Sequence, residues 1–150
     1  MKISNGFDVS ASALTAQRMR MDVISSNIAN AESTRGSFVD GKFEPYKRKM
    51  VVLAPNGQTF SSMFNQQLGQ TNQKHGVKVA KITEDSSPDK LVYNPTHPDA
   101  DEAGYVRMPN VDVTKEMIDM ISASRSYEAN VTAINASKSM FVKALEIGKK

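Results

Sequence analysis

The feature that most constrains the fold is an unbroken heptad pattern near the C-terminal end of the chain. Between Val113 and Leu145, the positions at alternating spacings of four and three are apolar except for Ser124 and Lys138, as in a helix that packs along another helix. No proline or glycine interrupts the pattern before Gly148. A helix of this length would be roughly 50 Å long, whereas a domain of 150 residues has a radius of gyration of about 15 Å. The helix must therefore project from the domain or pair along its length.

The N-terminal region carries a second and weaker heptad pattern. Its apolar residues stand seven apart, at Phe7, Leu14, Met21 and Ile28. Ile24 lies on the companion stripe, but polar residues interrupt that stripe, and such a helix is marginal in water without packing. The pattern predicts a helix over residues 6–31, with its N-cap at Ser4 or Asn5. We expect it to close near Gly36, which can adopt a left-handed turn.

The segment between the two helices, residues 35–110, has the character of a small β-rich module. Residues 46–54 and 77–84 are rich in β-branched and other apolar residues, which predicts strands. Residues 64–74 are rich in glutamine and asparagine and have no period, which predicts an exposed loop. Residues 85–106 contain three prolines among few apolar residues, which predicts an extended arm or loop.

These patterns together predict an α+β fold. Long N- and C-terminal helices pair as a coiled-coil domain, and a small β-rich insert lies between them. We divide the chain into an N-terminal coiled-coil helix (1–34), the insert with its extended loop (35–110) and a C-terminal coiled-coil helix (111–150), with the two termini forming one domain.

The composition restricts the classes of function. Hydrophobic residues make up 39% of the chain, which is below the usual share, so the core is modest or is completed by other chains. The net charge of +3, from 19 basic and 16 acidic residues, is too balanced to require a nucleic acid as partner. The absence of cysteine excludes disulfides, thiolate metal sites and a cysteine nucleophile. We expect neither a cleaved secretory signal nor a membrane-spanning segment.

Two groups of residues have side chains of the kinds that catalysis or metal binding uses. His97 and the acidic residues that follow it, Asp99, Asp101 and Glu102, could ligate a hard cation, but their spacing matches no established metal motif. His75 lies in a polar stretch without a recognisable partner for general-base chemistry. The sequence therefore predicts no catalytic residues, no cofactor and no metal, and the protein is not expected to be an enzyme.

A basic cluster in the insert is the best candidate for binding nucleic acid. It consists of Arg35, Lys42, Lys47, Arg48 and Lys49, with Phe43 and Tyr46 among the cations. Aromatic side chains between cations can stack on bases. No known nucleic-acid-binding motif frames the cluster, and lysines also protect a strand edge from wrong pairing. Nucleic-acid binding therefore stays as an alternative from a different class of function.

The two ends of the chain resemble the axial proteins of the bacterial flagellum, which comprise the rod, hook and hook-associated families. The N-terminal segment SALTAQRMRMDVISSNIANAEST contains the phrase NIANA followed by a threonine, Thr34, which is the signature of that group. The segment from Asn110 onward, NVDVTKEMIDMISASRSYEAN, is similar to the C-terminal signature. The middle segments PYKRKMVVL and LVYNPTHPDADEAGYVRMPNVDV narrow the resemblance to the proximal rod family.

This resemblance implies a structural subunit of the flagellar basal-body (proximal) rod, which polymerises through its terminal helices into a helical tube and transmits torque. It implies export by the flagellar type III apparatus without a cleaved signal peptide, and terminal helices that are disordered in the free subunit. The implied partners are other flagellar rod proteins, copies of the same chain and the export apparatus, without nucleic acid or direct membrane insertion. Another axial subunit of the rod or hook families remains an alternative.

We predict that the two heptad stripes meet in the assembly interface. The N-terminal residues are Phe7, Leu14, Met21, Ile24 and Ile28, and the C-terminal residues are Met117, Met120, Tyr127, Val131, Ile134, Phe141 and Leu145. Polar residues Asn27, Asn30, Asn130 and Asn135 are expected to fix the register of the helices through hydrogen bonds. Head-to-tail contacts that do not close produce a filament, which is what a rod requires.

Overall fold

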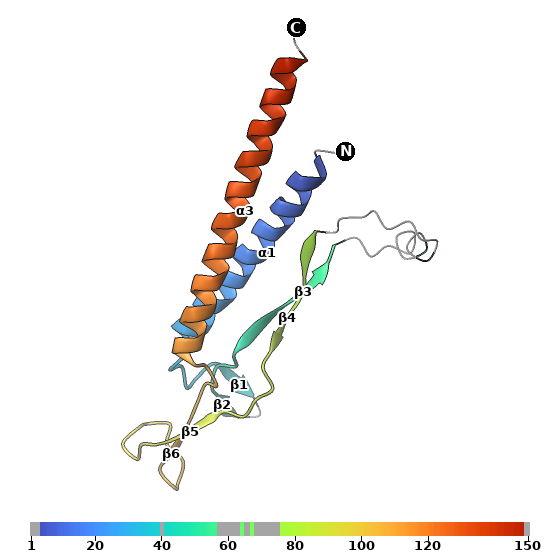
Figure 1. The fold of residues 1–150 in the computed structure, drawn as a ribbon. Coiled ribbons are helices and arrows are strands. Elements are labelled where there is room, and N and C mark those ends of the chain that lie inside the picture. The colour runs from blue at the N-terminus through green and yellow to red at the C-terminus, as the bar shows by residue number, and fades with distance from the viewer. Residues whose placement is uncertain (1–3, 40, 57–63, 65–66, 68–75, 149–150) are drawn as a thin grey trace. The chain divides into compact units, whose positions relative to one another are not determined.

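The computed structural model describes residues 4–39, 41–56, 64, 67 and 76–148. Two long helices, α1 (Ser4–Ala29) and α3 (Val113–Ile147), flank six short strands in chain order (Figure 1). The predicted α+β fold is thus confirmed. The predicted loop over residues 64–74 lies outside the described residues, apart from Phe64 and Gln67.

Helix α3 begins where a polar side chain can cap it. Asp112 Oδ1 accepts hydrogen bonds from the backbone N–H groups of Thr114, at 3.0 Å, and Lys115, at 3.3 Å. These groups have no partner within the helix, so the carboxylate stabilises the first turn. The helix ends at Ile147, immediately before Gly148, and its length agrees with the heptad pattern.

Helix α1 ends earlier than predicted, and Gly36 does not close it. The helix stops at Ala29, and turns formed by Asn30, Ala31 and Ser33 follow it. Positive φ angles among the described glycines occur at Gly41 and Gly104 rather than at Gly36. Gly36 instead lies against the backbone of Tyr46, where an added Cβ would stand 2.6 Å from the Tyr46 nitrogen. A close approach of two backbone segments, not a left-handed turn, therefore requires this glycine.

The six strands form three two-stranded sheets. Their bounds and pairs are β1 (Ser37–Val39) with β2 (Lys42–Glu44), β3 (Lys49–Pro55) with β4 (Val77–Glu84), and β5 (Lys90–Tyr93) with β6 (Tyr105–Met108). The pairs β1–β2 and β5–β6 are antiparallel. Backbone hydrogen bonds from Asn56 to Gly76 and from Asp85 to Arg48 flank β3 and β4 at their two ends, so this pair is also antiparallel. Strands β3 and β4 confirm the predicted strands over residues 46–54 and 77–84.

The prediction of an extended arm or loop over residues 85–106 was wrong in part, because residues 90–93 and 105–106 belong to the hairpin β5–β6 and only the segments between and before the strands are loops. Leu91 pairs with Arg107, and Tyr93 with Tyr105. The prolines flank the strands instead of interrupting them, so they remove no hydrogen bond from the ladder. The rings of Tyr93 and Tyr105 also meet edge to face at 5.3 Å, which stabilises the pair.

The contacts of the chain group into two compact units. We call Arg20–Val51 with Ile82–Ser122 the core unit, and Met1–Met19, Val52–Lys81 and Ala123–Lys150 the terminal unit. The boundaries fall within α1, α3, β3 and β4. Among the described residues, the buried hydrophobic residues of the core unit are Val23, Ile24, Val106 and Val111, whereas those of the terminal unit are Ala16 and Ala123. The predicted division into 1–34, 35–110 and 111–150 stays a prediction.

Candidate assembly interface

The two helices pack against each other in antiparallel directions. Within the core unit, Arg20 Nη2 donates to Asp119 Oδ1 at 2.9 Å, and Asn27 Nδ2 donates to Glu116 Oε2 at 3.0 Å. Within the terminal unit, a Cβ added at Gly6 would lie 3.9 Å from Ser137 Oγ. The residues that face across the helix pair therefore include polar side chains and glycine as well as apolar side chains.

The buried face of α1 is not centred on the predicted heptad stripe. Ala16, Val23 and Asn27 are buried and follow the helical period of 3.6 residues, and Ile24 is buried beside them. The predicted stripe lies about 100–160° around the helix from Asn27, on the flank of the buried face. Its residues, Phe7, Leu14, Met21 and Ile28, are all half-buried. Their side chains therefore remain partly available to another chain.

On α3 the predicted stripe crosses from an exposed face to the face that packs on α1. A strict seven-residue repeat drifts by about 20° per heptad on a straight helix. Met117 is consequently 56% exposed, and the buried position beside it belongs to Glu116. Further along the stripe, Met120, Tyr127, Val131 and Ile134 are half-buried, whereas Phe141 and Leu145 are exposed. The predicted assembly contacts of all these residues stay a prediction.

Three residues of α3 have an exposure that the heptad pattern did not predict. Glu116 is 1% exposed, and Ile118 and Ile121 are 63% and 62% exposed. Counting with a period of 3.6 from the buried Ala123 would have placed Glu116 on the buried face and both isoleucines on the outer face. The heptad count of 3.5 concealed this difference.

Asn27 forms the centre of a buried cluster that we call the polar clasp, made of the side chains of Asn27, Tyr46, Arg48 and Glu116. Asn27 Nδ2 donates to the Lys49 carbonyl at 2.8 Å, and Asn27 Oδ1 accepts from the Lys49 N–H at 2.9 Å. Its amide thus pairs with β3 as a neighbouring strand would. The Tyr46 hydroxyl also donates to Asn27 Oδ1 at 3.0 Å, and Asn27 is 1% exposed.

Glu116 and Arg48 supply the charged half of the polar clasp. Arg48 donates to Glu116 Oε1 from Nε at 2.7 Å and contacts the same oxygen from Nη2 at 2.6 Å. Arg48 Nη1 lies 3.4 Å from Asp85 Oδ2. Burial by itself lowers the pKa of Arg48, but the bonds to Glu116 and Asp85 raise that pKa above its usual value. Arg48 therefore stays charged, and its guanidinium faces the buried side chain of Glu116.

Two of the other asparagines predicted to fix the register bind a backbone carbonyl four residues earlier in the chain. Asn30 Nδ2 donates to the Ser26 carbonyl, and Asn130 Nδ2 donates to the Ser126 carbonyl, each at 2.8 Å. Asn135 is exposed. Only Asn27 bonds across the two helices among these four residues, and a role of the others between chains stays a prediction.

A second link joins the segment after α1 to the loop between β5 and β6. Asp99 accepts hydrogen bonds from Arg35 Nη2 at 2.6 Å and from Thr34 Oγ1 at 2.8 Å. The bond from Arg35, and then that from Thr34, hold the pKa of Asp99 below its usual value, while Asp99 raises the pKa of Arg35. His97 Nδ1 accepts from the Asp99 N–H at 3.1 Å.

The residues that the sequence suggested as metal ligands form hydrogen bonds within the chain instead. Asp101 Oδ1 accepts from the N–H groups of Ala103 and Tyr105, which closes a turn. Within the described ranges, no group of three or more histidine and acidic side chains is arranged to hold a metal ion. His75 lies outside these ranges.

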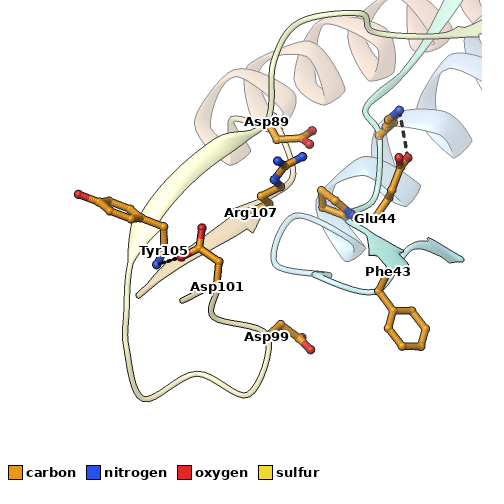
Figure 2. Close-up of a pocket in the computed structure, with 9 residues that line it drawn as sticks. Phe43, Glu44, Asp89, Asp99, Asp101, Tyr105 and Arg107 are labelled. Atoms are coloured by element: carbon orange, nitrogen blue, oxygen red, sulfur yellow. Dashed lines mark hydrogen bonds and ion pairs between the residues drawn. The ribbon is translucent and has the colours of Figure 1, made fainter. Parts of the chain in front are cut away.

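A hollow lined by four acidic and two basic residues, among others, lies on the insert (Figure 2). Arg107 points into it, and the acidic residues Glu44, Asp89, Asp99 and Asp101 line it. Phe43 and Tyr105 stand at its edge with exposed rings. The mixture of exposed aromatic rings and charges suits a contact with another protein.

The basic cluster is largely engaged within the core unit. Arg35 pairs with Asp99, Lys47 with Glu44 at 3.3 Å, and Arg48 with Glu116. Lys49 Nζ lies 5.6 Å above the ring of Tyr46. These cations hold segments of the chain together, which favours a structural role for the cluster over binding to phosphates.

Comparisons with known proteins identify the family. Residues 7–36 match the family described as "Flagella basal body rod protein", and residues 102–147 match "Flagellar basal body rod FlgEFG protein C-terminal". The flagellar basal-body rod protein FlgC of Bacillus subtilis (strain 168) is 59% identical over 150 residues, covering 99% of this chain and 100% of that protein. The chain belongs to the FlgC family of flagellar basal-body rod proteins.

Other FlgC proteins match over the same span. Those of Yersinia enterocolitica and Escherichia coli O6:H1 are 48% and 47% identical over 149 residues, and both alignments cover 99% of this chain and 100% of the relative. The resemblance to the proximal rod family is thus confirmed. The two matched regions contain the clasp residues Asn27 and Glu116. None of the helices that the structure describes combines the length and apolar character of a membrane span.

Proposed function

We propose that this FlgC-family chain polymerises through its terminal helices into the tube of the flagellar basal-body rod, which transmits torque. Its partners in the rod are other rod proteins and copies of itself. The observation that carries the proposal is the row of exposed apolar residues on α3. These are Met117, Ile118, Ile121, Met140, Phe141, Val142, Leu145 and Ile147, which are between 44% and 79% exposed. So much exposed apolar surface on one helix is typical of a surface that other chains cover.

The insert is proposed to contact neighbouring rod subunits from outside the tube. In hairpin β1–β2 the rings of Phe38 and Phe43 contact each other at a tilt of 58°, with centroids 4.9 Å apart, but the residues remain 66% and 56% exposed. Leu91 and Tyr93 of β5 are each 65% exposed. Large exposed aromatic residues are enriched where proteins bind each other.

The remaining functional inferences follow from this structural role. We propose that the chain leaves the cytoplasm through the flagellar type III export apparatus without a cleaved signal and resides in the basal body. We propose no enzymatic activity, cofactor, nucleic-acid binding or membrane insertion. The two termini act as one coiled-coil domain, because α1 and α3 pair in both units of the chain.

The proposal is tested by complementation. In a strain that lacks its own copy of this gene, the wild-type chain should restore motility and rods seen by electron microscopy of basal bodies. Leu14→Asp should abolish both, because it places a charge on the half-buried flank of α1 that the rod is proposed to cover. Thr15→Asp adds the same charge at an exposed position of the same helix and should retain function. Normal rods in the strain without the gene would refute the proposal.

A further inference from the structure

We propose that the start of β4 clips the first half of α1 onto the subunit and so fixes which flank of α1 faces other chains in the rod. The clip consists of Gly76 and Val77, and it contacts α1 at Val9 and Ser12. All four residues lie in the terminal unit. This inference deepens the proposed function by naming what positions one of its surfaces, and it rests on that function.

The hydroxyl group of Ser12 joins the clip to α1. Ser12 Oγ accepts a hydrogen bond from the Val77 N–H at 3.1 Å and donates to the Val9 carbonyl of its own helix at 2.7 Å. The second bond fixes the direction of the hydroxyl, so its lone pairs face β4. The Gly76 carbonyl accepts from the Asn56 N–H at 2.6 Å, just after the end of β3. The backbone of the clip is therefore bound to the hairpin on one side and to the helix on the other.

Gly76 lets the backbone of the clip lie directly on α1. A Cβ added at this position would overlap Ser12 Oγ and would stand 3.1 Å from Ser12 Cβ and 3.6 Å from Val9 Cα. The described glycines with a positive φ angle do not include Gly76, so its backbone conformation suits other residues as well. The closeness of α1 is therefore what requires glycine here.

The clip holds the side of α1 that lies opposite to the predicted stripe. Successive residues of an α-helix are turned by about 100° around its axis. The direction midway between Val9 and Ser12 is therefore about 180° around α1 from the direction midway between Phe7 and Leu14. Phe7 and Leu14 are half-buried, and the clip turns both of them away from itself. Their flank is thus the one left for other chains.

Helix α3 holds an adjacent side of α1 in the same unit. A Cβ added at Gly6 would lie 3.9 Å from Ser137 Oγ, and Gly6 is about 90° around α1 from the clip. The buried hydrophobic residues of this unit are two alanines among those described, and such small side chains do little to prevent rotation of the helix. A second contact at a right angle to the first prevents this rotation. The clip therefore acts as a positioning device for the flank with Phe7 and Leu14.

A disulfide across the clip tests whether the clip is closed in the rod, because the chain has no cysteine of its own. The full chain carrying both Ser12→Cys and Gly76→Cys is expressed in the strain that lacks the gene, and the cells are grown with an oxidant. The two Cβ atoms would stand 3.1 Å apart, near the span of about 3.5–4.5 Å in disulfides. We expect rods and motility, and a disulfide within each chain that blocks both thiols from maleimide until reduction.

A control pair, Ala11→Cys with Gly76→Cys, moves the first thiol by one residue. Ala11 is exposed and lies about 100° around α1 from Ser12. Both thiols of this pair should therefore stay reactive under the same treatment.

An exchange of side-chain size tests the effect of the clip on assembly. Gly76→Ala should reduce motility and the number of rods, because the new Cβ lifts the clip from α1. Gly148→Ala adds the same methyl group where the nearest heavy atom is 3.7 Å away and should retain motility. Adding Ser12→Ala to Gly76→Ala removes the Oγ atom that the new Cβ meets, so the double variant should regain motility.

The outcomes separate this inference from the proposed function. The clip is overturned if rods form but the first cysteine pair keeps its thiols free, links two chains, or reacts like the control pair. It is also overturned if the oxidant stops rod formation only with the first pair, or if the double variant swims no better than Gly76→Ala. If the first pair supports no rods even without oxidant, the size exchange decides alone. Normal rods in the strain without the gene would instead refute the proposed function.

Discussion

The core unit and the terminal unit contain parts of the same two helices, but they stabilise those parts in different ways. In the core unit the helices are bound to each other and to β3 through the polar clasp. The same unit also buries the apolar side chains of Ile24, Val106 and Val111. In the terminal unit the buried hydrophobic residues among those described are two alanines, and large apolar side chains of α3 face outward. One part of each helix is therefore held by its own chain, while the other part needs neighbours.

This contrast explains how one helix can serve two purposes. A buried ion pair requires exact partners and fixes a single arrangement of the chain, whereas an exposed apolar face gains free energy only when another surface covers it. Substitutions of the same chemical type in the two units should consequently have very different effects on the isolated subunit. The following experiments compare such matched pairs.

The largest effect is expected at Arg48. Arg48→Ala leaves Glu116 buried without its cation, and breaking a buried pair in this way costs about 3–5 kcal/mol of the free energy of unfolding. Arg125→Ala removes an arginine whose pair with Glu128 is exposed, and such pairs contribute about 0–1 kcal/mol. Urea unfolding followed by near-ultraviolet circular dichroism measures both values, because Tyr46 lies in the clasp. Equal losses in the two variants would contradict the contrast between the units.

A second large effect is expected at Asn27. Asn27→Ala leaves the N–H and carbonyl of Lys49 without their side-chain partner, and each such buried group costs about 1–3 kcal/mol. Asn130→Ala, in the terminal unit, removes only a bond to the Ser126 carbonyl of its own helix and should change stability by less than about 0.5 kcal/mol. Hydrogen exchange at the Lys49 amide provides a local check, since exchange should accelerate only in the first variant.

Two valines compare apolar packing in the two units. Val106 is 2% exposed, so Val106→Ala should lower the free energy of unfolding by about 2 kcal/mol through lost burial and a cavity. Val142 is 44% exposed, so Val142→Ala should change it by less than about 0.5 kcal/mol in the isolated subunit. Thermal unfolding of the two variants measures the difference. A similar loss at Val142 would show that the end of α3 is packed within the free subunit.

The smallest effect is expected from the pH dependence of Asp99. Its pKa is lowered in the folded chain, first by the bond from Arg35 and then by that from Thr34. The carboxylate therefore stabilises the fold fully above its unfolded pKa of about 4, and this contribution disappears as the pH falls through the folded value. Unfolding measured from neutral to acidic pH should show wild type more stable than Asp99→Asn at pH 7, with the gap closing below about pH 4. A gap that is constant with pH would exclude this linkage.

Elements that depend on local patterns could be predicted from the sequence, whereas contacts between residues far apart in the chain could not. The heptad pattern of α3 predicted its bounds, and the alternating residues of β4 predicted that strand, because both patterns are local. The hairpin β5–β6 was missed, since its prolines suggested an extended arm although they lie outside the ladder. Gly36 was predicted to close α1, whereas it lies against the backbone of Tyr46, a contact that no local pattern reveals.

For the candidate interface, the sequence identified the helices but not the orientation of each face. A 3.5-residue repeat drifts around a helix of 3.6 residues per turn, so it placed Met117 inward, where the structure exposes it and buries Glu116 instead. Ile118 and Ile121 could be recognised as an exposed apolar patch only from the structure, which shows which face of α3 is buried. Asn27 was predicted to form hydrogen bonds between the helices. The structure shows that its side-chain amide also bonds to the backbone of Lys49, as the backbone of a neighbouring strand would.

The sequence by itself determined that two long helices at the ends of the chain enclose a β-rich insert, and its terminal motifs determined the family. Periodicity and signature residues are properties of neighbouring positions, so they can be read without coordinates. Only the tertiary structure decided that Asn27, Arg48 and Glu116 meet in one buried clasp and that the outer face of α3 stays apolar and exposed. The physical reason is that burial and ion pairing depend on residues far apart in the chain, such as Arg20 and Asp119, which are 99 positions apart and meet only through the packing of the whole unit.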